Sequence, residues 1–282
     1  MKFQIFLVVV SNLLISPMLA AGCYTVDDAA KKGLIKYIFK SKGGYTGNVI
    51  ELKIENLTDE MLDLKIEAGR RLDSKVDAEQ DILVTQAREY FVNSKSTHSF
   101  NVTGMCCQAH NSAPTKGNVY GIGAMAADRL VKLACFLDKS NLSEDYAAQE
   151  AVWTVSNNNS LASIESSDTA ITNKLQQFVS SITGRSIPKY HVTYEQTGDH
   201  VADKITKVDG IFTYSPSSNG HITIGIYDAS GKLIQLLFQD ITHERGECKL
   251  YFVFNTKNLP EGTYFTRMTN NGMVEKEEKI EI

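Results

Sequence analysis

The sequence predicts an α+β protein in which a β-sandwich plus a three-helix segment is followed by an all-β domain. Three observations support this prediction. Short segments alternating apolar and charged residues fill much of the chain before residue 105, segments with helical spacing occupy about 125–184, and alternation returns after about 204. With 282 residues, 43% of them hydrophobic, the chain is long enough for two domains with separate cores.

The first 22 residues have the pattern of an export signal. Met1 and Lys2 form a short positive region, residues 5–15 are mostly apolar, and Pro17 ends this run ahead of small residues. The run is too short for a transmembrane helix, and no later run is long enough. We therefore expect a signal peptide over 1–22 and a secreted or cell-surface location at the outer membrane.

Cys23 follows Ala20, Ala21 and Gly22, and this context resembles a bacterial lipobox. It departs from that pattern because Ala20 stands where a leucine is usual. One interpretation is that Cys23 becomes a lipidated N-terminus, which would be the chain's only membrane anchor. The other is cleavage nearby, which would leave a bare cysteine.

The first domain is expected to span 24–195. Its strands are predicted at 34–39, 49–55, 62–67, 81–85 and 99–105, and Gly117 and Gly121 indicate a loop around Tyr120. Helical spacing predicts a first helix over about 125–137, a second N-capped by Ser143, and a third that begins at Asp168 and ends at Gly184.

The second domain is expected to span 204–282, after a polar linker at 196–203. Its strands are predicted at 222–227, 233–238, 249–254, 263–268 and 276–282. The segment 228–231 predicts a hairpin turn because Gly231 adopts a positive φ at little cost.

The last quarter of the chain resembles the immunoglobulin-like C-terminal sorting domain of type IX secretion substrates. The features that carry this resemblance are the Ile222, Ile224, Ile226 alternation, the Asp228-x-x-Gly231-Lys232 turn, the segment 259–264 (Leu-Pro-Glu-Gly-Thr-Tyr) and the closing strand 279–282. It implies that the domain is an address read by the secretion machinery and often removed at the surface. Cys248 and the acidic cluster 275–278 depart from the pattern, and an immunoglobulin-like module without a sorting role stays open.

Cys106, Cys107 and His110 are the densest group of reactive side chains in the sequence. A thiolate nucleophile paired with His110 is one interpretation, although no orienting residue or oxyanion hole is evident. The other is a structural disulfide. Cys106, Cys107, Cys135 and Cys248 are the candidates, with a bond to Cys135 joining the strands to the first helix. Adjacent cysteines do not have the spacing of a zinc site.

The segment 148–153 (Ala-Gln-Glu-Ala-Val-Trp) resembles the Gln-x-x-apolar-apolar motif of thioester domains in bacterial surface adhesins. That resemblance implies a bond between Gln149 and Cys106 or Cys107, which acylates an amine of the partner. Met105 stands where that family prefers Phe, Tyr or Leu. The alternative is a helix that simply buries Trp153.

Other features bear on the class of function. The net charge of −4, with both signs spread along the chain, argues against a nucleic-acid partner. No phosphate loop, serine elbow or metalloprotease motif is present, so no cofactor or resident metal is expected. Asp77, Glu79 and Asp81 are interpreted as a solvated edge. Tyr190, His191 and Tyr194 are interpreted as packing residues or a ligand shelf.

Taken together, these features predict an exported surface or secreted protein that is not an enzyme. Its N-terminal domain would bind or adhere to an unidentified surface ligand, and its C-terminal domain would direct secretion. The rival hypothesis is a covalent thioester adhesin or a cysteine-dependent enzyme that uses Cys106 or Cys107.

Overall fold

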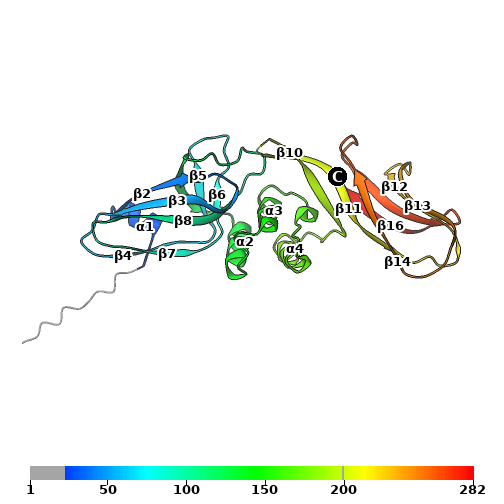
Figure 1. Ribbon diagram of the computed structural model, residues 1–282, viewed down its shortest axis with the longest axis horizontal. Coiled ribbons are helices and arrows are strands. Elements are labelled where there is room, and N and C mark those ends of the chain that lie inside the picture. The colour runs from blue at the N-terminus through cyan, green and yellow to red at the C-terminus, as the bar shows by residue number, and fades with distance from the viewer. Residues whose placement is uncertain (1–22, 199) are drawn as a thin grey trace, which may run out of the picture.

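The computed structural model describes residues 23–198 and 200–282, so the expected signal peptide lies outside the described residues. A β-rich part, a helical segment and an all-β part follow one another along the long axis of the molecule (Figure 1). Within the described ranges, no helix is long and apolar enough to cross a membrane.

The first part is a closed six-stranded barrel and not the expected sandwich. Strand β9 pairs with β2 on one side and with β5 on the other, which closes the sheet. The sequence indicated a loop here because Gly117 and Gly121 lie on either side of Tyr120. The order around the barrel is β2 (Ile35–Ser41), β3 (Thr46–Asn56), β8 (Thr97–Cys106), β6 (Ile82–Val84), β5 (Arg70–Ser74) and β9 (Val119–Met125).

A small second sheet and the short helix α1 (Val26–Lys31) complete this part. The sheet has the order β1 (Tyr24–Thr25), β4 (Leu62–Ile66) and β7 (Arg88–Val92). Alternate residues of β3 and β4 point inward, as the period of two predicts, and they bury Leu52, Ile54 and Leu64 completely. These side chains share one core, so their burial favours packing of the small sheet against the barrel.

The helical segment contains α2 (Asp128–Lys139), α3 (Tyr146–Ser156), the 3-10 turn η1 (Leu161–Ser163) and α4 (Thr169–Thr183). The predicted start and end of the last helix are confirmed, since Asp168 caps the Ala170 N–H and Gly184 has a φ of 76°. The second helix is capped by Asp145 and not by Ser143. The hydroxyl of Ser143 instead donates to the Thr85 carbonyl at 2.7 Å in a buried contact.

The all-β part consists of two sheets around one core. One sheet has the order β10 (Tyr190–Thr197), β11 (His200–Tyr214), β14 (Cys248–Asn255). The other has the order β13 (Leu233–His243), β12 (Gly220–Asp228), β15 (Thr263–Asn270), β16 (Met273–Glu281). Ile222, Ile224 and Ile226 are fully buried between the sheets, together with Phe212 and Phe254.

Residues 196–203 were expected to form a linker; of these, 196–197 end strand β10 and 200–203 begin strand β11. Gln196 pairs with Val201, and Thr197 pairs with His200. Val201 also packs against the barrel core, and its N–H donates to the Ala109 carbonyl at 3.0 Å. The hairpin therefore contacts the first part of the chain while belonging to the sheets of the last part.

Candidate functional site

Cys106 and Cys107 lie where β8 ends, and their side chains enter different cores. Successive residues of a strand point to opposite faces. Cys106 accordingly packs in the barrel core, whereas Cys107 packs in the cluster formed with the helices. Cys106 is fully buried and Cys107 is 8% exposed.

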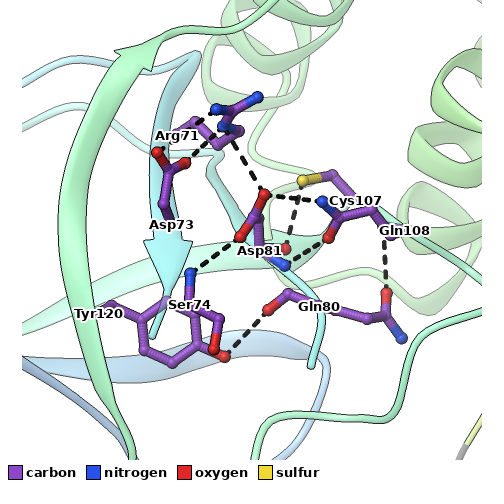
Figure 2. Close-up of polar contacts among 8 residues, drawn as sticks. All are labelled: Arg71, Asp73, Ser74, Gln80, Asp81, Cys107, Gln108 and Tyr120. Atoms are coloured by element: carbon purple, nitrogen blue, oxygen red, sulfur yellow. Dashed lines mark hydrogen bonds and ion pairs between the residues drawn. The ribbon is translucent and has the colours of Figure 1, made fainter. Parts of the chain in front are cut away.

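A polar network centred on Asp81 holds the segment that follows the cysteines (Figure 2). The Asp81 carboxylate accepts from Gln108 Nε2 at 2.7 Å and from the Ser74 N–H at 2.8 Å. Arg71 Nε lies 3.8 Å from the same carboxylate. The Cys107 thiol donates to the Asp81 carbonyl at 3.2 Å, so the backbone on both sides of Cys107 is fixed.

Gln80 connects this network to the helices. Its Oε1 accepts from the Gln108 N–H at 3.3 Å, and its carbonyl accepts from the Tyr120 hydroxyl at 3.0 Å (Figure 2). The same Oε1 also accepts from Trp153 Nε1 at 3.3 Å. Trp153 lies on α3, so one buried glutamine joins the barrel to that helix.

Gln149 of α3 is placed against Cys106. The Cys106 N–H donates to Gln149 Oε1 at 3.1 Å, and Gln149 Nε2 donates to the Cys106 carbonyl at 2.8 Å. Both residues are fully buried. The two residues that the thioester resemblance pairs are therefore neighbours, although they are 43 positions apart in the sequence.

Both thiols are poor nucleophiles as free groups. Burial raises the pKa of Cys106 well above its ordinary value, and neighbouring Cys107 and Glu79 raise it further. Burial and the Asp81 charge raise the pKa of Cys107 to about 12. The thiolate is the reactive form, so this site is unsuited to a conventional cysteine hydrolase.

The structure does not bring His110 to the cysteines. Its Nδ1 lies 3.0 Å from the Val201 carbonyl, and its Nε2 lies 3.0 Å from Asp203 Oδ1. Both ring nitrogens are thus engaged by β11, and the cysteine–histidine pair suggested by the sequence does not form.

The expected disulfides are absent, because all five cysteines are free. Cys106 and Cys107 are separated by the strand backbone. Cys135 lies on α2 beside a cleft of about 590 Å³, and Cys248 Sγ lies 4.0 Å from His243 Nε2 in the last part of the chain. Cys23 is exposed directly before β1, and its lipidation stays a prediction.

Of the carboxylates that the sequence suggested as a solvated edge, Asp77 is exposed, Asp81 is half-buried and Glu79 is buried. Glu79 is buried and accepts from Ser74 Oγ at 2.9 Å and Asn118 Nδ2 at 3.0 Å. Its role is to hold the loop before β9. Across residues 23–198 and 200–282, no group of three or more His, Cys, Asp or Glu side chains is arranged to hold a metal ion.

Sequence reasoning missed Glu150, a carboxylate that is 8% exposed on α3. Burial raises its pKa to about 7, and hydrogen bonds from Ser163 and Tyr146 limit this rise. The available signal was a charged residue inside the otherwise uncharged run 146–153.

Of the aromatic residues singled out in the sequence, Tyr194 accepts from the Ser160 N–H at 2.8 Å, and Tyr190 accepts from the Glu281 N–H at 3.1 Å.

The end of the chain, with its two packed sheets, is the part that the comparison with known families matches. Residues 208–282 match the family of secretion system C-terminal sorting domains, so this part of the chain is a type IX secretion C-terminal sorting domain. The protein is therefore secreted or displayed at the cell surface and interacts with the secretion machinery. The comparisons give no support to the thioester adhesin resemblance. No curated protein matches the chain.

Proposed function

We propose that this protein is carried to the cell surface by its sorting domain and that residues 23–186 bind an extracellular partner there. The observation that carries the proposal is the family match at 208–282. The barrel and helices lie outside the matched segment and have their own cores, so they are available for a second task.

The sorting role is tested by fusing the sorting domain to another protein. Residues 187–282, which contain the whole C-terminal β part, are fused to a carrier protein with a signal peptide in a bacterium that has type IX secretion. The expected result is carrier at the surface or in the medium. The same carrier without the fusion is the control, and equal retention of both inside the cell would contradict the proposal.

A second candidate is covalent attachment through a thioester between Cys106 and Gln149, which the contact between these residues favours. Cys106 Sγ would bond to the Gln149 side-chain carbonyl carbon, and ammonia would leave. A partner amine would then attack that carbon, which forms an amide and releases the Cys106 thiol. Burial of both residues would protect the thioester from water.

A cavity of about 250 Å³ lies beside the Tyr45 segment, which contacts Cys106 through its backbone. It is lined by Tyr45 and Trp153 among others, and the Tyr45 carbonyl accepts from the Cys106 N–H at 3.0 Å.

The intact mass of the mature native protein tests the covalent candidate. A thioester lowers the mass of the protein by one ammonia. Treatment with methylamine then raises the mass of the thioester form by one methylamine. The Cys106→Ser and Gln149→Ala variants should lose this deficit. Cys107→Ser is the matched control and should keep it, because that side chain enters the other core. An unmodified mass for the native protein would rule the thioester out.

A further inference from the structure

A small cavity lies between α3, the residues after η1 and strand β10. Its volume is about 220 Å³. This is below the ~300–1,000 Å³ typical of pockets for drug-sized ligands, so the space suits a single side chain or a short alkyl group. The lining residues that matter here are Tyr146, Glu150, Ser163, Glu165, His191 and Tyr194.

Glu150 is buried in this lining without a cation. Among the residues that the structure describes, no ion pair includes it, and its hydrogen bonds come from the neutral hydroxyls of Ser163 and Tyr146. A buried carboxylate without a compensating charge is costly. Its neighbours Ala147, Ala148 and Ala151 are apolar and buried, so helix packing alone gives no reason for a glutamate.

The surrounding charges add to the negative potential. His191 Nε2 lies 3.1 Å from Glu165, and its Nδ1 lies 3.6 Å from Asp209. Lys207 pairs with Asp209 at 2.8 Å but does not line the cavity. His191 Nδ1 is buried without a hydrogen-bond partner, whereas Asp209 is compensated by Lys207. Two carboxylates, those of Glu150 and Glu165, therefore line the cavity, and its lining contains no lysine or arginine.

We propose that this cavity binds a primary alkylammonium group, with the charge against the Glu150 carboxylate and the alkyl part between Tyr146 and Tyr194. The bound cation would supply the positive charge that no side chain of the protein places next to Glu150 among the described residues. The lysine side chain of a partner protein has this chemistry. The site goes beyond the proposed function, because it needs no bond between Cys106 and Gln149.

The test measures binding of n-butylammonium chloride to the full mature protein by calorimetry. It is carried out in the native protein and in Cys106→Ser, which cannot acylate the amine. We expect Glu150→Gln to weaken binding at least tenfold in both backgrounds, whereas Glu89→Gln on another face should not. Thermal unfolding verifies that each variant is folded.

The pH dependence adds a second readout. The titratable groups that face Glu150 are Tyr146 on α3, Glu165 after η1, and His191 and Tyr194 on β10. With the Glu150 pKa near 7, affinity should rise by up to about tenfold between pH 6 and pH 8. The proposal would be overturned if Glu150→Gln bound the amine as tightly as the native protein. It would also be overturned if neutral n-butanol bound as tightly as the amine, or if no binding were seen at millimolar amine. Loss of binding only in Cys106→Ser would also overturn it, by tying the signal to the thioester.

Discussion

At the residue scale, the most informative side chains are those whose chemistry disagrees with their surroundings. Glu150 is an ionisable side chain on the buried face of its helix. The side-chain amide of Gln149 makes both of its hydrogen bonds to one residue, Cys106. Buried polar groups of this kind are costly unless they are satisfied, and the two neighbours differ in that respect. Gln149 is satisfied internally, whereas Glu150 lacks a cation.

Glu150 should make stability fall as pH rises. Its pKa goes from an ordinary 4.5 in the unfolded chain to about 7 in the native state, so between these values the native protein binds more protons. The free energy of unfolding should therefore decrease by up to about 3 kcal/mol across this window. Urea unfolding of native protein and Glu150→Gln at pH 5 and pH 8 measures this. The variant should lose most of the difference, and an unchanged difference would contradict the assignment.

Gly104 on β8 should not tolerate a side chain. A Cβ there would lie 2.5 Å from Ile82 Cγ2 and 2.8 Å from the Leu83 carbonyl oxygen, and the latter cannot move without distorting β6. We expect Gly104→Ala to destabilise the protein by roughly 1–3 kcal/mol. Gly33→Ala is not a matched control, because Gly33 has a φ of 69°. Ser99→Ala on the same strand, at an exposed position, should change the unfolding midpoint in urea very little by comparison.

At the element scale, helices and strands with regular spacing of apolar residues could be predicted from the sequence, whereas elements interrupted by glycines could not. The helix that begins at Asp168 and ends at Gly184 followed directly from its two caps. Strand β9 did not, because Gly117 and Gly121 on either side of Tyr120 have the pattern of a loop. The missed strand is the one that closes the barrel. For the site, adjacency of Cys106 and Gln149 was suggested only by the motif, since spacing alone cannot place a strand against a helix.

The cap of α4 provides a test at this scale. The Asp168 carboxylate accepts from the Ala170 N–H at 2.8 Å, and Asp168→Ala leaves that N–H without its partner. We expect a loss of about 1 kcal/mol in the free energy of unfolding. Asp168→Asn keeps the acceptor and should lose only a few tenths. Equal losses in the two variants, measured by urea unfolding, would show that the cap contributes little.

At the scale of the whole molecule, the structural unit at the end of the chain is longer than the segment that matches the sorting family. The match begins at 208, but β10 and the first half of β11 precede it and belong to the same sheet. Val192 on β10 is 1% exposed and lies in the core of the two sheets. A linker was predicted here because the polar composition near Gly198 is that of a turn, and a turn and a linker look alike in a single sequence.

This longer unit predicts a difference between two fragments. The fragment 187–282 should melt cooperatively, and the fragment 208–282 should melt at a temperature lower by on the order of 10 °C, because it loses the burial of Val192 and exposes the edge of β11. Circular dichroism on heating measures both. Identical melting temperatures would mean that β10 is dispensable for the sheets.

The five free thiols place a constraint on how the protein reaches its destination. An exported chain passes through an environment in which disulfides form readily. While the chain is unfolded, neighbouring Cys106 and Cys107 are open to oxidants, whereas in the native state each is enclosed in its own core. Cys106 and Cys107 should therefore stay reduced only if the barrel closes around β8 before the thiols are oxidised.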